Sequence, residues 1–245
     1  MQFENRVIII TGAASGIGLA TAKRFAAEGG KIVLADINAD KLKQAENEVK
    51  TAGAADIWIS ECDVSNEQQV KATVDGALEH LGGFDVMINN AGMMIFKKIE
   101  EQTENDWIKI LSVDLLGAFF FTKQAFLQMK NGGVIVNVSS IHAIETTPNV
   151  ATYAAAKSAL LSLTRSASVE GKPKKIRVNA VLPGAIDTPM LWDNPNVKAG
   201  LEKIEMADVG KPEDIADVIV YLASDKAAFI QGAAIRVDGG RLDRL

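Results

Sequence analysis

Short runs of β-branched and aliphatic residues alternate along this chain with stretches that carry a helical pattern. Several of the runs are apolar at nearly every position, which is typical of strands covered on both faces. Alternating strands and helices predict a parallel sheet with helices on both faces and right-handed crossovers. The runs expected to form strands are Val7–Thr11, Lys31–Asp36, Asp56–Ser60, Phe84–Asn89, Val134–Ser139, Ile176–Leu182 and Ala234–Asp238.

Helices are expected between these runs. Two of them carry a capping-box pattern at the start, Ser65 with Gln68 and Thr103 with Asp106. The expected helical stretches include Leu19–Glu28, Lys41–Ala52, Asn66–Leu81, Glu104–Met129 and Thr152–Glu170. No repeat or linker divides the chain, so residues 1–245 are predicted to form one α/β domain with a doubly wound sheet of seven strands.

The segment Pro183–Lys211 breaks the alternating pattern. It contains Pro183, Pro189 and Pro195, and it shows no clear strand. A long irregular insertion in a compact fold is often a functional lid. Residues 183–211 are therefore predicted to form a lid over a substrate site.

Composition excludes several classes of function. The formal net charge is −5 and no basic block is interleaved with aromatic residues, so no nucleic-acid partner is expected. No signal peptide and no membrane span are expected, because no apolar run approaches the ~20 residues that a span needs. One cysteine, Cys62, fits a reducing, cytoplasmic compartment, and with only His80 and His142 a zinc site is not expected.

A glycine-rich turn follows the first expected strand. Gly12, Gly16 and Gly18 open the first helix, where free N–H groups and the helix dipole favour a phosphate. Asp36 ends the second strand, where a carboxylate can accept both ribose hydroxyls and repel a 2′-phosphate. These features predict a dinucleotide site that prefers NAD to NADP, although Lys41 and Lys43 can soften this preference. The alternatives are a plain structural turn and an Asp36 that only caps the next turn.

Three residue types suited to proton transfer lie in the middle of the chain. Tyr153 and Lys157 are four residues apart and share one helix face, with about 5–6 Å between Cβ atoms. Lowering a tyrosine pKa from 10 by three units needs roughly 4 kcal/mol. An ammonium at ~4 Å supplies a similar attraction at an effective dielectric constant of ~20. Tyr153 is therefore predicted to be the general base for alcohol oxidation, although Tyr-x-x-x-Lys also arises by chance on helices.

These motifs together resemble the short-chain dehydrogenase/reductase family. The turn has the Gly-x-x-x-Gly-x-Gly spacing of that family, and Ser140 rather than Ser139 precedes Tyr153 by the thirteen residues that the family shows. The resemblance runs from Phe3 to about Gly240 and is similar to glucose dehydrogenase-like and 3-oxoacyl-carrier-protein reductase-like members. It implies a Rossmann fold and an NAD-dependent oxidoreductase that moves hydride between nicotinamide and a secondary alcohol or ketone, such as a sugar or polyol.

The resemblance also implies roles for particular residues. Ser140 orients the substrate oxygen toward Tyr153, and His142 joins these two residues as a substrate contact, although a solvated loop histidine is the alternative. Glu145 and Thr147 lie in the same substrate-lining stretch, and Leu191, Trp192 and Met206 are expected to add apolar surface from the lid. The cofactor contacts implied are Gly12, Ser15, Gly16, Ile17, Gly18, Asp36, Asp63, Val64, Asn90, Gly92, Tyr153, Lys157, Pro183, Gly184, Ile186 and Thr188.

One position departs from the family pattern. The family usually has Asn in its fourth helix, where the main-chain carbonyl holds a water linked to the lysine, and this chain has Asp114. A main-chain role survives the change, so Asp114 is kept as a relay residue. A carboxylate near Lys157 is expected to shift the pKa values of both groups.

The resemblance implies a homotetramer. Its two dyads would use the helices Glu104–Met129 and Thr152–Glu170 and the last strand, and the tail Arg241–Leu245 is expected to cross to a neighbouring subunit. Two rival interpretations remain at this point. One is a sensor that binds dinucleotide without turnover, although such relatives usually lose the Tyr or the Lys. Another is an epimerase or dehydratase, although those relatives tend to be longer.

Overall fold

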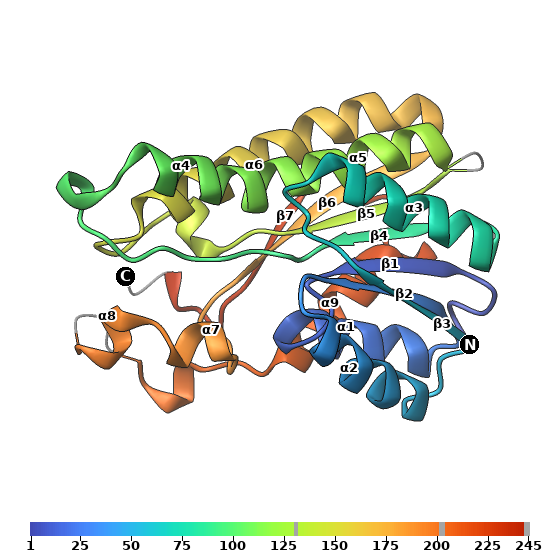
Figure 1. Ribbon diagram of the computed structural model, residues 1–245, viewed down its shortest axis with the longest axis horizontal. Coiled ribbons are helices and arrows are strands. Elements are labelled where there is room, and N and C mark those ends of the chain that lie inside the picture. The colour runs from blue at the N-terminus through green and yellow to red at the C-terminus, as the bar shows by residue number, and fades with distance from the viewer. Residues whose placement is uncertain (130–131, 201–203, 243–245) are drawn as a thin grey trace.

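A computed structural model of the chain describes residues 1–129, 132–200 and 204–242. Its centre is a parallel sheet with the strand order β3-β2-β1-β4-β5-β6-β7 (Figure 1). The strands are β1 Val7–Thr11, β2 Lys31–Asp36, β3 Asp56–Glu61, β4 Val86–Asn89, β5 Gly133–Val138, β6 Ile176–Pro183 and β7 Ala234–Val237. The predicted fold class, a doubly wound parallel sheet of seven strands, is confirmed.

Helices cover both faces of this sheet. In Figure 1, α1, α2 and α9 lie on one side and α3, α5 and α6 on the other. The longer helices are α1 Gly16–Ala27, α2 Ala39–Thr51, α3 Glu67–Leu81, α4 Glu104–Leu111, α5 Gly117–Gln128, α6 Ala151–Gly171 and α9 Pro212–Ala223. Side chains alternate along each strand, so Ile8 and Ile10 join the core on one face and Val7 and Ile9 the core on the opposite face.

The strand order reverses between β1 and β4. β1 pairs with β2 on one side and with β4 on the other, and the chain continues outward from each of these strands. Open sheets of this kind bind ligands in the crevice beyond the carboxyl ends of the strands at the reversal point. The turns that follow β1, β4 and β5 are therefore the places where site residues should meet.

The start of α3 differs from the sequence prediction. The N-cap is Asn66, whose side-chain oxygen accepts hydrogen bonds from the main-chain N–H groups of Gln68 and Gln69 at 3.0 and 3.3 Å. Ser65 instead donates its hydroxyl to Asp63 at 2.7 Å. The prediction of a Ser65–Gln68 capping box was therefore wrong. The helix begins one residue later, and the Ser65 hydroxyl is hydrogen-bonded to the Asp63 carboxylate instead.

The predicted helix Glu104–Met129 is not regular throughout. α4 ends at Leu111, a π-helical turn occupies Ser112–Leu116, and α5 begins at Gly117. By length and composition alone the whole segment could cross a membrane. Its residues Ile110 and Phe121 are fully buried, so these apolar side chains pack inside the protein. Single π-helical turns often mark functional positions, and this one carries Asp114.

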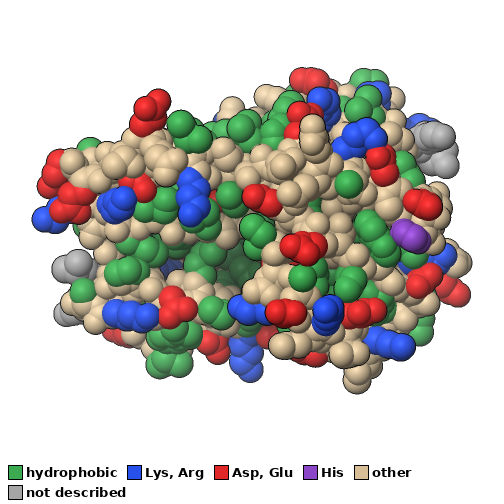
Figure 2. Space-filling view, viewed as in Figure 1, with side chains coloured by type: hydrophobic (Ala, Val, Ile, Leu, Met, Phe, Trp, Pro, Cys, Tyr) green, Lys and Arg blue, Asp and Glu red, His purple; other side chains and the backbone are tan. Residues whose placement is uncertain are grey.

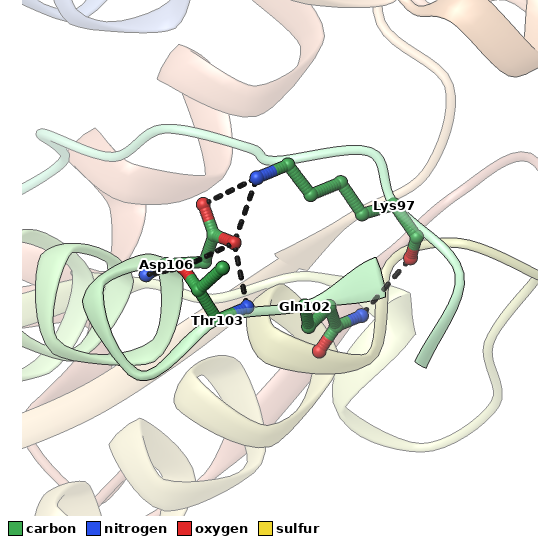
Figure 3. A network of polar contacts seen from close by, with 4 residues as sticks. All are labelled: Lys97, Gln102, Thr103 and Asp106. Carbon is green, nitrogen blue, oxygen red and sulfur yellow. Dashed lines mark hydrogen bonds and ion pairs between the residues drawn. The ribbon is translucent and has the colours of Figure 1, made fainter. Parts of the chain in front are cut away.

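A polar network fixes the loop that leads into α4 (Figure 3). The Lys97 ammonium lies 2.9 and 2.8 Å from the two carboxylate oxygens of Asp106. Thr103 and Asp106 form the predicted capping box, which is thereby confirmed. The Gln102 side chain donates to the Lys97 carbonyl at 3.0 Å, and the Lys97 main-chain N–H donates to the Asn149 carbonyl at 2.9 Å. The network therefore ties the loop after β4 to the start of α4 and to the segment before α6.

Asp106→Asn is expected to lower stability in a pH-dependent way. The hydrogen bond from Lys97, followed by the main-chain and hydroxyl bonds from Thr103, holds the pKa of Asp106 at about 2, below its ordinary value. The stabilisation from a depressed carboxyl pKa is present above the unfolded value of about 4 and is lost as the pH falls toward the folded value. Urea unfolding should therefore show the largest difference between wild type and variant near pH 7, and this difference should shrink below pH ~4. A difference that stays constant with pH would contradict this.

The described part of the segment 183–211 contains two short α-helices, α7 Pro189–Trp192 and α8 Pro195–Lys198, and a 3₁₀ helix over Met206–Asp208. The Asn196 side chain accepts a hydrogen bond from the Asn149 amide at 2.9 Å and donates to the Pro148 carbonyl at 2.8 Å. The Asn149 contact joins this segment to the loop that the Lys97 network holds. Residues 201–203 of the predicted lid lie outside the described residues.

Candidate active site

A cavity of about 520 Å³ opens at the carboxyl ends of the strands. Its walls come from the turn after β1, the ends of β2, β3, β4 and β5, the helix α6, and the segment after β6. Figure 2 shows the molecule hollowed between the two layers, with hydrophobic side chains around the hollow. Most of the predicted cofactor and catalytic residues line this cavity: Gly12, Ser15, Gly16, Ile17, Asp36, Asp63, Val64, Asn90, Gly92, Ser140, His142, Tyr153, Lys157, Pro183, Gly184, Ile186 and Thr188.

The glycine turn has the geometry that close backbone approach requires. Gly12 and Gly16 have φ values of +61° and +52°, which favour glycine. The Asn90 side chain donates to the carbonyls of Thr11 and Gly12 at 2.9 and 3.2 Å, which ties the turn to the end of β4. Gly18 lies beneath the turn rather than on the cavity wall, where a Cβ would collide with the Gly12 carbonyl. Asn90 and Gly18 thus shape the turn from behind.

The start of α1 offers main-chain donors to the cavity. Ser15 is the N-cap residue with extended backbone and no side-chain cap bond, and it is exposed. No acidic side chain lies in the first turn of α1. Unsatisfied N–H groups at such a helix start suit a phosphate group.

Two carboxylates mark the opposite wall of this end of the cavity. Asp36 at the end of β2 accepts hydrogen bonds from the main-chain N–H groups of Ala14 at 3.1 Å and Asn38 at 3.0 Å. Asp63 accepts from Ser65. The Asp36 carboxylate therefore braces the glycine turn and precedes α2, while it still faces the cavity.

The two neighbouring serines at the end of β5 have different environments. Ser139 donates its hydroxyl to the Lys157 main-chain carbonyl at 3.0 Å, which joins β5 to α6. Ser140 accepts from the His142 N–H at 3.2 Å and interacts with the Tyr153 hydroxyl. Of the two serines, Ser140 is therefore the one whose hydroxyl interacts with the Tyr153 hydroxyl.

Lys157 is held inside the site by two acceptors. Its ammonium donates to the Val138 carbonyl at 3.1 Å and lies 3.2 Å from a carboxylate oxygen of Asp114. The same ammonium lies 5.5 Å from the centre of the Tyr153 ring. The Lys157 and Asp114 side chains are only 4% and 0% exposed, so they form a fully buried ion pair.

The π-helical turn aims the Asp114 side chain at this pair. The second carboxylate oxygen of Asp114 accepts from the Met93 N–H at 3.0 Å. A Cβ on Gly92 would lie 3.1 Å from Asp114 Oδ2 and 3.2 Å from Lys157 Nζ, so glycine leaves just enough room for the ion pair. Asp114 was predicted to act through its main chain and to shift the pKa of Lys157 as a nearby carboxylate, and the direct side-chain contact agrees with the second expectation.

The buried pair changes the expected acidity of Tyr153. Burial raises the pKa of Tyr153, the Lys157 charge lowers it, the Asp114 charge raises it again, and Ser140 lowers it, with a net rise above the ordinary value. Lys157 thus lowers the pKa of Tyr153 as predicted, but burial, which disfavours the phenolate, and then the Asp114 charge outweigh this effect in the protein alone. Burial also raises the pKa of Asp114. Burial disfavours the Lys157 ammonium, but Asp114 and Tyr153 hold its pKa above the ordinary value.

The segment after β6 closes the remaining side of the cavity. A Cβ on Gly16 would lie 3.1 Å from the Thr188 methyl, so this segment reaches the glycine turn. Leu191 lines the cavity as predicted, whereas Trp192 and Met206 do not, because the Trp192 indole donates to Asp187 at 2.7 Å and Met206 is 70% exposed. Glu145 and Thr147, also named as candidates, lie outside the wall.

Several wall residues were not singled out from the sequence. Most are apolar side chains in loops after strands, where position in space rather than a local pattern decides the role. Arg241 was named only as part of a tail that crosses to another subunit, and residues 243–245 of that tail lie outside the described residues. These additional wall residues include Ile37, Cys62, Met93, Met94, Ile141, Met190, Asn194 and Arg241. Across the described residues, no cluster of three or more His, Cys, Asp or Glu side chains is arranged to hold a metal ion.

Comparison with known proteins shows the family to which the chain belongs. A family model described as enoyl-(acyl carrier protein) reductase matches residues 12–241. A 3-oxoacyl-[acyl-carrier-protein] reductase of Thermotoga maritima is 36% identical over 98% of this chain and 99% of its own. A cis-4-hydroxycyclohexanecarboxylate dehydrogenase of Sinomonas cyclohexanicum is 39% identical over 97% of both chains.

The fold of the chain is also similar to that of a solved structure. The 3-ketoacyl-(acyl-carrier-protein) reductase from Brucella melitensis, complexed with NADH, superposes with a TM-score of 0.89 and 34% identity over 98% of this chain and 99% of that chain. Fold, motif spacing and relatives lead to the same conclusion. The chain belongs to the short-chain dehydrogenase/reductase family of oxidoreductases that act on CH–OH groups.

Proposed function

We propose that this protein is an NAD-dependent dehydrogenase/reductase that interconverts a secondary alcohol and a ketone, with Tyr153 as the proton-transfer residue. The observation that carries the proposal is the convergence of Ser140, Tyr153 and Lys157 on the wall of one cavity, which the glycine turn also lines. Ser140 meets Tyr153, and Lys157 lies beneath the tyrosine ring. This arrangement is suited to holding one substrate oxygen and moving one proton.

The residues present fit a nicotinamide dinucleotide. A Cβ on Gly12 would lie 2.9 Å from the Asn90 amide, and one on Gly16 would meet Thr188, so only glycine leaves the cradle open. The first turn of α1 and Ser15 would hold the pyrophosphate, Asp36 the adenosine ribose, and Asp63 with Val64 the adenine. Gly184, Ile186 and Thr188 would lie against the nicotinamide amide.

The protein's own residues handle the proton. A bound oxidised nicotinamide would accept the hydride and would bring a positive charge into the site. Ser140 donates a hydrogen bond to the substrate oxygen, and Tyr153 takes the hydroxyl proton in oxidation or gives it in reduction. Because the pKa of Tyr153 is raised, the phenol is protonated at neutral pH and ready to act as the acid for ketone reduction.

The test is a screen of hydride transfer. Secondary alcohols, polyols and sugars are offered with NAD and with NADP, and the corresponding ketones with NADH and NADPH, while absorbance of the reduced cofactor is followed. We expect turnover with at least one alcohol–ketone pair, and oxidation that accelerates as the pH rises above neutral, because loss of the Tyr153 proton is then favoured. Cofactor binding without turnover of any pair would favour the sensor alternative.

Asp36 supports NAD as the preferred cofactor. Its carboxylate lines the cavity at the end of β2, where it would repel a 2′-phosphate. Asp36→Ala is expected to lower the ratio of kcat/KM for NAD over NADP by about five- to thirtyfold, since a charge repulsion of roughly 1–2 kcal/mol is removed. Asp63→Ala serves as the control, because it removes a carboxylate from the same end of the cavity at the adenine position. An equal change in both variants would contradict the assignment.

A second candidate function is reduction of a 3-oxoacyl group on a carrier protein. Two of the relatives described above have this activity in their names. Ketone reduction of this kind uses the same proton donor, so the two candidates differ in the substrate and not in the mechanism. Acetoacetyl-carrier protein and acetoacetyl-coenzyme A in the screen would separate them.

Assembly and location are also proposals. Large apolar side chains are exposed on the outer surface of α4, the π-helical turn, α5 and α6, which supports helix-mediated pairing within a homotetramer. They are Trp107, Ile108, Leu116, Phe119, Leu127 and Val169.

The only cysteine, Cys62, is buried and unbridged, which supports a reducing, cytoplasmic location.

A further inference from the structure

The turn after β7 contributes Arg241 to the active-site wall. After β7, the Asp238 carboxylate accepts hydrogen bonds from the N–H groups of Gly240 at 3.0 Å and Leu242 at 2.8 Å. The Arg241 N–H donates to the Asp238 carbonyl at 3.0 Å. A Cβ on Gly184 would lie 2.8 Å from Asp238 Cα. The turn that carries Arg241 is therefore fixed against the end of β6.

Packing places this turn at the substrate end of the cavity. Leu242 packs against the small cluster of Ile141, Ala180 and Leu182. Ile141 follows Ser140 directly and itself lines the cavity. Arg241 precedes Leu242, is only 8% exposed and also lines the cavity. Arg241 therefore belongs to the part of the wall next to Ile141 and Ser140.

Charge along the wall is unevenly distributed. Among the described residues that line the cavity, the acidic ones are Asp36 and Asp63, both at the glycine-turn end. The basic ones are Lys157, whose ammonium forms the ion pair with Asp114, and Arg241. The wall between them is largely apolar, with Met93, Met94, Ile141, Met190 and Leu191. A guanidinium with little solvent at the edge of an apolar pocket is a strong receptor for an anion.

We propose that Arg241 binds a carboxylate of the substrate, so that the preferred substrate is a hydroxy or oxo acid with an apolar body between the acid group and the reacting carbon. This inference rests on the proposed function and names its substrate class. A guanidinium carries five N–H donors in a planar fork, so it can hold a protein acceptor and a substrate carboxylate together. The Sinomonas relative, named for a hydroxycyclohexanecarboxylate, supports the class.

The test measures ligand binding rather than turnover. Cyclohexanecarboxylate and benzoate are titrated into the complex of the protein with NADH, in parallel with their uncharged carboxamides, and Kd is obtained by calorimetry. We expect the acids to bind at least about tenfold more tightly than the amides, since a bidentate guanidinium–carboxylate contact away from water is stronger than a neutral one. Arg241→Gln should abolish this preference without weakening the amides, and Arg241→Lys should retain part of it.

A matched control separates contact from general charge. Lys198→Gln removes one positive charge from α8 in the lid, where Lys198 pairs with Asp193 at 2.9 Å and does not line the cavity. This variant should keep the full preference for acids. Acids that bind no better than amides, or an Arg241→Gln variant that keeps the preference, would overturn the inference. Turnover of neutral alcohols with no role for Arg241 would refute this inference alone, whereas absence of hydride transfer with every substrate would refute the proposed function.

Discussion

Tyr153→Phe should lower kcat by about a thousandfold in both directions, because general acid–base catalysis by a positioned side chain contributes roughly 10²–10⁴. The phenylalanine ring fills nearly the same buried space, but it can neither accept the proton of an alcohol nor donate one to a ketone. The cradle for the dinucleotide lies largely elsewhere on the wall, in the glycine turn and at Asp36. Stopped turnover with retained NADH binding, measured by fluorescence titration, is therefore the expected combination.

The chain provides a matched control for this substitution. Its second tyrosine, Tyr221, lies on α9 and is 46% exposed, away from the cavity wall. Tyr221→Phe removes the same hydroxyl group and should leave kcat unchanged. Ser140→Ala and Ser139→Ala form a second pair, in which the larger loss is expected for Ser140 because it meets the Tyr153 hydroxyl. Near-normal turnover in Tyr153→Phe would contradict the assigned role.

The strands were predictable from the sequence to within two residues at either end. β1 and β2 match the expected bounds, and β4 begins at Val86 rather than at Phe84. The reason is physical: strands buried on both faces need near-continuous apolar runs, and these are visible in one dimension. Helix starts depended on competition between neighbouring polar side chains. Asp63 takes the Ser65 hydroxyl and leaves Asn66 as the cap of α3, which spacing alone does not reveal.

The site was predictable where a motif fixes it and not where the fold brings distant residues together. Tyr153 and Lys157 meet because they are one helical turn apart. The Asp114 side chain contacts Lys157 from a π-helical turn, and no residue pattern in the sequence indicates that turn. The direction of the Tyr153 pKa shift depends first on burial and then on the charges of Lys157 and Asp114, so it could not be obtained from the Tyr–Lys pair alone. Arg241 enters the wall through the packing of Leu242, which depends on tertiary contacts.

The buried ion pair leads to a second large effect, on stability. Lys157→Met would leave the Asp114 carboxylate with only the Met93 N–H as a partner at a position with no solvent exposure. Removing one partner of a buried pair typically costs about 3–5 kcal/mol, because the remaining charge is uncompensated. Urea unfolding should show a loss of this size, and kcat should fall at least about a hundredfold because Lys157 no longer positions Tyr153 and its charge is gone.

The double variant Lys157→Met/Asp114→Asn separates the two consequences. Asparagine still accepts from Met93 but carries no charge, so the double variant should recover most of the lost stability and none of the activity. Asp114→Asn alone should keep kcat within about tenfold, since it retains the lysine, and should move alkaline activation of oxidation to lower pH by removing a charge that raises the pKa of Tyr153.

An exposed ion pair provides a control for the stability loss expected in these variants. Lys123 and Glu67 lie 2.7 Å apart, and each side chain is nearly half exposed. Lys123→Met should cost at most about 1 kcal/mol, as surface pairs do. The cost of Lys157→Met should also grow as the pH rises, because an unpaired buried carboxyl group is best tolerated when protonated. A loss of unfolding free energy in Lys157→Met no larger than in Lys123→Met would contradict this prediction. The Asp114 side chain would then already be solvated or neutral, and its charge could not raise the pKa of Tyr153.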